Sequence, residues 1–160
     1  GMGIVKQYST ELTDFATYLD IFEEELARRK ENVQENGIKV LKEEPLLLLV
    51  VQNKDIYSAD GVTKNQVEQY KKIVKQYKQF KVCFIFADVL NAPAAFSAPE
   101  MLKASKEYET FMICDDLANV KLIDFNAATL KQYKKQIELG DSFLVTAGVV
   151  KKQKNIYEEA

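Results

Sequence analysis

The chain has 160 residues, of which 47% are apolar and 29% are charged, and its formal net charge is −2. These values are typical of one globular domain with a substantial core, and a pI of about 5.4 gives no electrostatic basis for general nucleic-acid binding. No apolar run approaches the length of a membrane helix. The sequence contains no histidine, which excludes His-based catalysis and nearly all zinc and haem sites.

Gly1 precedes Met2, which is typical of a tag remnant. We therefore expect residues 1–9 to be a tag remnant and leader, residues 10–154 to form a single α/β domain, and residues 155–160 to be a tail.

The first predicted element is an amphipathic helix over residues 10–36. Its apolar residues recur every three or four positions, so they share one face, which we expect to pack on a sheet. That face comprises Leu12, Phe15, Leu19, Phe22 and Leu26. The opposite, solvated face is expected to carry three acids and then three bases: Glu23, Glu24, Glu25, Arg28, Arg29 and Lys30.

An unbroken apolar run follows at residues 46–51, after a connector with at most a short edge strand at residues 38–41. Extended residues would direct apolar side chains to both sides, so the run predicts a central strand of a parallel sheet covered on both faces. Ligands of such sheets bind beyond the carboxyl ends of the strands, which here means residues 52–55.

The remaining pattern alternates helices and strands. Helices are predicted at residues 64–79 and 127–137, and a short one runs from a capping box at residues 97–100, with Pro99 at the first helical position, to about residue 106. Strands are predicted at residues 81–87 and 110–114. Ala147-Gly148 predicts a two-residue turn between strands at 142–146 and 149–154. The order predicts an α/β fold with three layers: a mostly parallel sheet, helices on both of its faces, and a C-terminal antiparallel hairpin.

Acidic residues follow three of the predicted strands. They are Asp55, Asp88, Asp115 and Asp116. In neighbouring parallel strands these carboxylates would gather at one rim, where they could hold magnesium for phosphoryl transfer. The alternative is that they cap the following helices or begin turns. None of the six glycines is followed by Lys-Ser or Lys-Thr, so the chain lacks a conventional phosphate-binding loop.

Three segments together resemble a known family. Residues 24–30 (Glu-Glu-Leu-Ala-Arg-Arg-Lys) precede the strand at 46–51, residues 85–88 read Ile-Phe-Ala-Asp, and residues 140–145 read Gly-Asp-Ser-Phe-Leu-Val. In this order and spacing, residues 10–154 resemble the latter two-thirds of an FtsK/SpoIIIE-like ATPase domain. They look most like the degenerate last ATPase domain of the membrane-bound type VII secretion motor. The resemblance implies a partial RecA-like P-loop fold.

The chain departs from the active members of that family. Where those members have an Asp-Glu pair after the Walker B strand, this chain has Gln52 and Asn53, which can neither attract magnesium by charge nor act as a base. The sensor position holds Asp88 or Val89 in place of glutamine, and no Walker A segment is found before residue 10. The resemblance therefore implies a chain that is not an enzyme and needs neither ATP nor magnesium.

The implied role is a binding domain at the cytoplasmic face of a secretion motor. Such a domain binds secreted helical-hairpin substrates or regulates a neighbouring ATPase, and it can form homo-oligomers. Residues 90–96, with Leu90, Pro93 and Phe96, are one candidate contact surface. An ordinary packed connection between a strand and a helix is the alternative interpretation of that loop.

Two other functions remain open from the sequence. One is a small magnesium-binding domain, receiver-like or phosphatase-like, that uses the acids at the strand ends. The other is a structural module without a ligand, which would expose an apolar edge and dimerise or aggregate.

Overall fold

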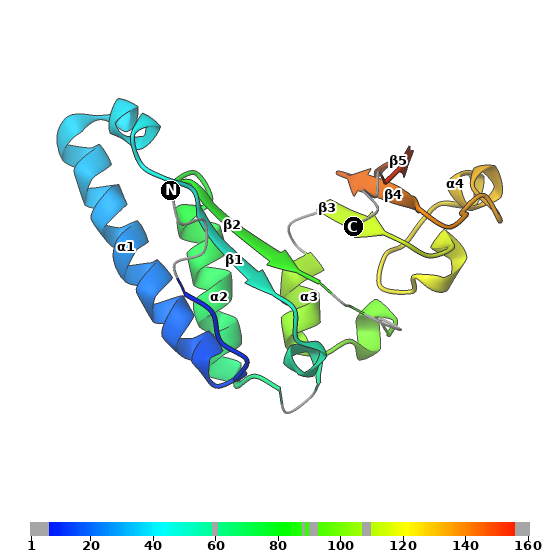
Figure 1. Ribbon diagram of the computed structural model, residues 1–160, viewed down its shortest axis with the longest axis horizontal. Coiled ribbons are helices and arrows are strands. Elements are labelled where there is room, and N and C mark those ends of the chain that lie inside the picture. The colour runs from blue at the N-terminus through cyan, green and yellow to red at the C-terminus, as the bar shows by residue number, and fades with distance from the viewer. Residues whose placement is uncertain (1–6, 59–60, 88, 90–92, 107–109, 156–160) are drawn as a thin grey trace, which may run out of the picture. The chain divides into compact units, whose positions relative to one another are not determined.

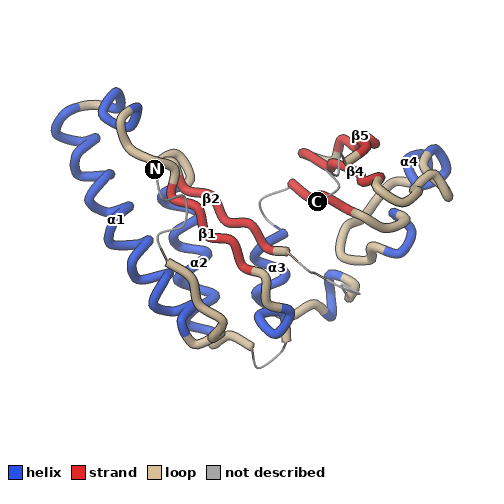
Figure 2. The backbone as a smooth tube through the Cα atoms, in the orientation of Figure 1, coloured by secondary structure: helices blue, strands red, loops and turns tan. Residues whose placement is uncertain are grey.

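The structure is a computed structural model that describes residues 7–58, 61–87, 89, 93–106 and 110–155 (Figures 1 and 2). The chain divides into two compact units, Gly1–Val89 and Leu90–Ala160, which we call unit 1 and unit 2. Unit 1 contains a two-stranded parallel sheet and unit 2 a three-stranded antiparallel sheet. The predicted α/β class is confirmed.

Unit 1 alternates helices and strands along the chain. Its elements are α1 (Asp14–Asn36), the 3₁₀ helix η1 (Ile38–Lys42), β1 (Leu47–Val51), the 3₁₀ helix η2 (Lys54–Tyr57), α2 (Lys64–Tyr77) and β2 (Val82–Phe86). Residues 38–41, for which a short edge strand was expected, lie in η1, so that expectation was wrong. Gly37 ends α1 with a φ of 83°, which lets the chain turn directly into η1.

The predicted apolar stripe is buried from Phe15 onward, whereas Leu12 lies before the first residue of α1, Asp14, and is half-buried. Phe15, Leu19, Phe22 and Leu26 are all buried. The same spacing continues to Arg29, whose side chain is also buried, with 1% of it exposed. The expectation that Arg29 lies on the solvated face was therefore wrong, because the position belongs to the buried stripe.

α2 lies beside α1, and both helices pack on one face of the sheet (Figure 1). Thr63 and Gln66 form a reciprocal capping box at the start of α2. The ring of Phe84 in β2 contacts Phe22 from α1 at 5.5 Å and Tyr70 from α2 at 5.1 Å between centroids. The core of unit 1 is thus built between the two helices and the inner face of the two strands.

The outer face of this sheet differs from the expectation of cover on both sides. Exposure alternates along β1, with Leu48 and Val50 exposed and their neighbours half-buried, and Ile85 in β2 is exposed as well. Within the described residues of unit 1, helices cover one face only. The apolar run at 46–51 therefore has a buried side and an exposed side.

Unit 2 is a mixture of short helices and antiparallel strands. Its elements are the 3₁₀ helix η3 (Ala95–Ser97), α3 (Glu100–Lys106), β3 (Thr110–Ile113), the 3₁₀ helix η4 (Leu117–Asn119), α4 (Ala127–Gln132), β4 (Asp141–Thr146) and β5 (Val149–Lys154). β3 was expected as a parallel neighbour of the earlier strands, but it pairs antiparallel with β4. The pairing places Ile113 directly opposite Phe143, and both side chains enter the core of unit 2.

The predicted hairpin is confirmed. β4 and β5 pair from Thr146↔Val149 to Asp141↔Lys154, and the turn residues Ala147 and Gly148 have φ values of 47° and 78°. Two positive φ values are the mark of a type I′ turn, whose twist matches that of the strands. The helix predicted to reach residue 137 begins at its expected cap, Asn126, but ends at Gln132.

Candidate functional site

The residues after β1 are the amides that the sequence singles out. Gln52 is exposed, and the side-chain oxygen of Asn53 accepts a hydrogen bond from the backbone N–H of Asp55 at 2.9 Å. Asn53 thereby caps η2, because its side chain accepts from a backbone N–H that has no partner within the helix. Neither amide carries a charge, so this strand end provides no carboxylate for a metal and no general base.

Asp55 lies in a tightly folded loop. Its side chain is exposed, and its carbonyl oxygen accepts hydrogen bonds from the Ser58 N–H at 3.0 Å and the Ser58 hydroxyl at 2.8 Å. At Gly61 the backbone comes back against Asp55, and a Cβ at this position would lie 1.7 Å from the Asp55 carbonyl oxygen. The loop is therefore held by backbone contacts of Asp55, and only glycine fits at position 61.

Asp115 and Asp116 hold the turn after β3. The Asp115 carboxylate accepts from the Asp116 N–H at 2.6 Å and from the Asn119 side-chain amide at 3.0 Å. Asp116 accepts from the Ala118 N–H at 2.9 Å and from the Lys135 N–H at 3.2 Å. These bonds are those of capping and turn residues, which is the alternative that the sequence left open.

The predicted acidic rim does not have the parallel sheet on which it depended. Asp55 belongs to unit 1, Asp115 and Asp116 belong to unit 2 in a different sheet, and Asp88 lies outside the described residues. Among the residues that the structure describes, no group of three or more His, Cys, Asp or Glu side chains is arranged to hold a metal ion.

Among the described residues of the predicted contact loop, Phe96 is the exposed one. It lies in η3 with 89% of its surface exposed, while Pro93 is half-buried and Leu90 lies outside the described residues. The N–H and the hydroxyl of Ser97 both donate to the Ala94 carbonyl oxygen, at 2.9 and 3.2 Å. A hydrogen-bonded turn thus presents the Phe96 ring to solvent.

The buried Arg29 is a site that the sequence analysis missed. Its guanidinium donates to the Glu25 carboxylate at 2.8 Å, and the Glu44 carboxylate lies 3.7 Å away. It also donates to the carbonyl oxygens of Pro45, Phe80 and Lys81, at 2.9, 3.1 and 3.4 Å. Pro45 lies just before β1, and Phe80 and Lys81 lie just before β2. Arg29 therefore joins the beginnings of both strands to α1.

Glu25 is the acid most affected by this network. The Arg28 guanidinium, with further help from Arg29, lowers the pKa of Glu25 from 4.5 to about 2, against the effect of partial burial. Arg28 donates to both Glu25 oxygens at 2.7 Å and to Glu44 at 2.9 Å. The cluster is thus two arginines shared between two carboxylates, an arrangement that fixes charges in place and leaves no group suited to proton transfer.

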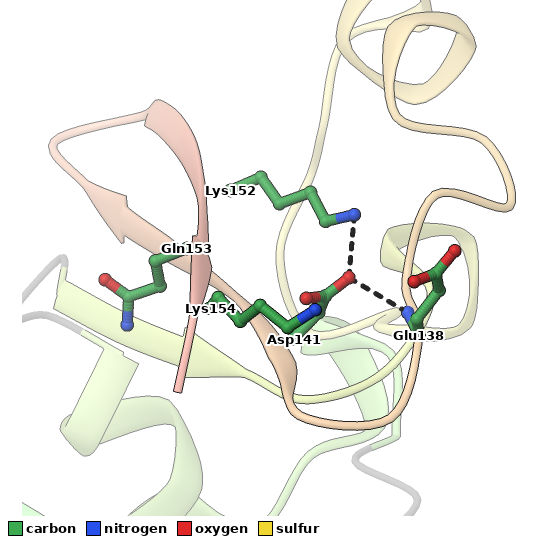
Figure 3. Close-up of a pocket in the computed structure, with 5 residues that line it drawn as sticks. All are labelled: Glu138, Asp141, Lys152, Gln153 and Lys154. Carbon is green, nitrogen blue, oxygen red and sulfur yellow. Dashed lines mark hydrogen bonds and ion pairs between the residues drawn. The ribbon is translucent and has the colours of Figure 1, made fainter. Parts of the chain in front are cut away.

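Unit 2 contains an open pocket of about 330 Å³ on the β4–β5 hairpin (Figure 3). Its lining residues are Glu138, Asp141, Lys152, Gln153 and Lys154. The buried Asp141 carboxylate accepts from the Lys152 ammonium at 2.7 Å and from the Glu138 N–H at 3.2 Å. The Lys152 contact lowers the pKa of Asp141 from its usual value. The main charges of the pocket therefore satisfy each other and anchor the turn before β4.

The sequence contained a signal for Arg29 but not for the pocket. Arg29 follows Leu26 by three positions and Glu25 by four, so it continues the apolar stripe and lies next to an acid on the same helix. The pocket depends on which side chains face each other in the hairpin, and the three lysines of β5 are typical of an ordinary exposed strand.

None of the helices in the described part of the chain is both long and apolar enough to cross a bilayer. Comparison of the chain with protein-family models, with curated proteins and with solved structures gave no match in any of the three cases.

Proposed function

We propose that the chain is a non-catalytic, degenerate FtsK/SpoIIIE-like ATPase domain of a type VII secretion apparatus. In this role it binds secreted helical-hairpin substrates or regulates an adjacent ATPase, at the cytoplasmic face of a membrane-bound assembly. The observation that carries the proposal is at the end of β1. Gln52 and Asn53 stand where an active member has its two acids, and the Asn53 oxygen is committed to capping η2.

The local arrangement in unit 1 supports the resemblance further. In the family-like segment at residues 24–30, Arg29 contacts the residues before β1 and β2, and Glu25 accepts from it on the same helix. Arg28 contacts Glu44 in the connector before β1. The element order of helix, strand, helix and strand, with β1 and β2 parallel, is the order that the resemblance implies. These features support a structural role for the charged segment at residues 24–30, with ATP hydrolysis carried out by the adjacent ATPase.

Phe96 is the side chain that we assign to substrate contact. An aromatic ring exposed on a fixed turn contributes large apolar area to an interface at little cost in conformational entropy. The substrates that the resemblance implies are helical hairpins, which such domains bind by their C-terminal signals. Pro93 lies in the same loop and adds a rigid neighbour.

The test is isothermal titration of the full chain with the C-terminal tail peptides of small secreted helical-hairpin proteins from the same organism. We expect micromolar binding of a tail peptide and no heat from Mg-ATP. Phe96→Ala should weaken the peptide by about tenfold or more, as expected for a central aromatic contact. Leu139→Ala is the matched control, because Leu139 is a fully exposed apolar residue of the same unit outside the loop.

Three outcomes would contradict the proposal. Magnesium-dependent ATP turnover by contaminant-free protein would make the chain an enzyme. Binding of magnesium alone, lost in Asp115→Asn, would favour the magnesium-binding alternative. Absence of binding to any tail peptide and to Mg-ATP would leave the structural module.

A further inference from the structure

The outer edge of β1 is open in unit 1. β1 pairs with β2 on one side, and among the described residues of this unit no strand pairs with its other side. The Leu47 N–H donates to the Lys81 carbonyl, and the Val51 carbonyl accepts from the Ala87 N–H. Leu47 and Val51 therefore direct their backbone groups towards β2. Because these groups alternate along a strand, the amides and carbonyls of Leu48 and Val50 point to the open edge.

Within the described residues of unit 1, this edge lacks the features that normally protect one. Edge strands are usually guarded by lysines, by a proline that removes an N–H, by a bulge, or by a covering element. Residues 46–51 carry no charge. Pro45 precedes the strand, but its carbonyl accepts from Arg29 next to the start of β2, and by the same alternation its missing N–H also faces away from the open edge.

The residues with unpaired backbone groups also expose apolar side chains. Leu48 is 47% exposed, and Leu46 and Val50 are exposed to a similar degree. Ile85 lies beside Val50 on the same face, because the two residues are paired between β1 and β2. The open edge and the uncovered apolar face of the sheet therefore meet along β1, on the side opposite α1 and α2 (Figure 2).

We propose that two copies of this chain pair antiparallel through the open edges of β1, with Leu48 opposite Leu48 at the two-fold axis. In this register Leu46 of each copy lies opposite Val50 of the other, so every exposed apolar residue of the edge meets an apolar partner. In both copies, residues 46, 48 and 50 direct their N–H and C=O groups to the shared edge. Each of them can therefore donate to and accept from the residue opposite it. No charged residue lies within the paired run.

The symmetry of the edge favours a second copy as the occupant. A two-fold axis makes the same surface serve both partners, and the antiparallel arrangement is the one that such an axis gives to two identical strands. Shifting the register by two residues places Leu46 opposite Gln52 in both halves of the pair and loses these apolar contacts. The paired copies form a continuous four-stranded sheet. This inference does not depend on the secretion role proposed above.

A disulfide test examines the register directly. Leu48→Cys is introduced into a chain that also carries Cys83→Ala and Cys114→Ser, because Cys83 is the β2 neighbour of Leu48 and both native cysteines are free thiols. Directly opposed residues in a hydrogen-bonded antiparallel pair have Cα atoms about 5.5 Å apart, which suits a disulfide. Oxidation with copper phenanthroline should convert the dimer to a covalent form that a thiol reductant reverses.

Ile85→Cys in the same background is the matched control. Ile85 is 45% exposed on the same face, but it lies one strand further from the axis. The two copies of residue 85 would be separated by at least three strand spacings, or about 14 Å, which no disulfide spans. Efficient cross-linking at Leu48→Cys and none at Ile85→Cys is the expected result. Equal cross-linking at both positions, or none at Leu48→Cys, would overturn the proposal.

Sedimentation equilibrium of the untagged full chain provides the second measurement. We expect a reversible monomer–dimer equilibrium, and Leu48→Lys should raise the dimer Kd by at least about tenfold, because it places two ammonium groups opposite each other at the axis. Val149→Lys, at an exposed apolar position in unit 2, should leave the Kd unchanged. Circular dichroism confirms that both variants fold. A wild-type chain that stays monomeric at all concentrations, or a Leu48→Lys chain with the wild-type Kd, would overturn the proposal.

Discussion

Among the residues that the structure describes, each unit buries one charged side chain close to the beginning of a strand, but the two are held differently. In unit 1, Arg29 contacts two carboxylates and three backbone carbonyls that come from three separate segments. In unit 2, Asp141 is held by one lysine from the neighbouring strand and one N–H from the preceding turn. The parallel sheet thus relies on a long-range polar centre, whereas the contacts of Asp141 in the antiparallel sheet come from its own β4–β5 hairpin and the turn before it.

The difference follows from how the strands are connected. β1 and β2 are parallel, so the chain must cross over through α2 between them, and the turn chemistry alone cannot set their pairing. β4 and β5 are joined by a two-residue turn that sets their pairing directly. Breaking the polar centre of each unit should therefore have unequal effects.

Arg29→Met is expected to have the largest effect. It leaves Glu25 and Glu44 with fewer partners and buried carbonyls without a donor, so we expect a loss of about 3–5 kcal/mol in the free energy of unfolding. Hydrogen exchange in urea, read from peptides of α1 and β2, measures this loss within unit 1. Arg28→Met is the control: it removes an exposed guanidinium from the same two carboxylates and should cost much less stability than Arg29→Met.

Asp141→Asn should destabilise unit 2 by less than Arg29→Met destabilises unit 1. The substitution removes the charge that pairs with Lys152 but keeps an oxygen that can accept from the Glu138 N–H. Exchange of β4 and β5 amides is the measurement, and Lys151→Met provides a control at an exposed position of β5, next to Lys152. A loss equal to that of Arg29→Met would contradict the contrast between the two units.

Acidification should weaken unit 1 over a defined range. The pKa of Glu25 is about 2 in the folded chain and 4.5 ordinarily, so its contribution is complete above pH 4.5 and is lost as the pH falls towards 2. We expect this loss to reach about 1–2 kcal/mol. Stability measured by urea unfolding between pH 6 and 2 should fall less steeply in Glu25→Gln. Identical slopes in the two proteins would show that the ion pair does not stabilise the fold.

The smallest expected changes concern the hairpin turn. Gly148 has a φ of 78°, and a Cβ there would meet nothing within 4 Å, so Gly148→Ala should cost about 1 kcal/mol from backbone strain alone. Ala147 also has a positive φ, and Ala147→Asn should gain roughly a few tenths of a kcal/mol, because asparagine tolerates this conformation. Thermal unfolding of the two variants should therefore shift in opposite directions.

The sequence predicted correctly those elements that are determined by side-chain periodicity, caps and turns within a short stretch of chain. The stripe from Phe15 to Leu26 gave the buried face of α1, and Ala147-Gly148 gave the hairpin with its strand bounds nearly correct. Asn126 also caps α4 as expected. In each case the decisive contacts lie within a few residues along the chain.

What the sequence could not give was the partner of each strand. The segment at residues 110–114 has the same apolar character as a parallel strand, and only the competition between β2 and β4 for pairing decides its direction. The exposed face of β1 was missed for the same reason, since a run of six apolar residues does not reveal that one side stays uncovered. The acids after the strands were visible, but their roles depended on that pairing.

The contacts of Arg29 also bear on the register of the parallel strands. The run of four leucines and two valines at residues 46–51 would present almost the same side chains to the core if β1 slid by two residues along β2. Such a slide moves the strand by about 6.6 Å, which would carry the Pro45 carbonyl out of reach of the guanidinium while Phe80 and Lys81 stayed in place. Arg29 therefore selects one alignment among several that the apolar side chains tolerate, and its loss should yield a mixture of alignments.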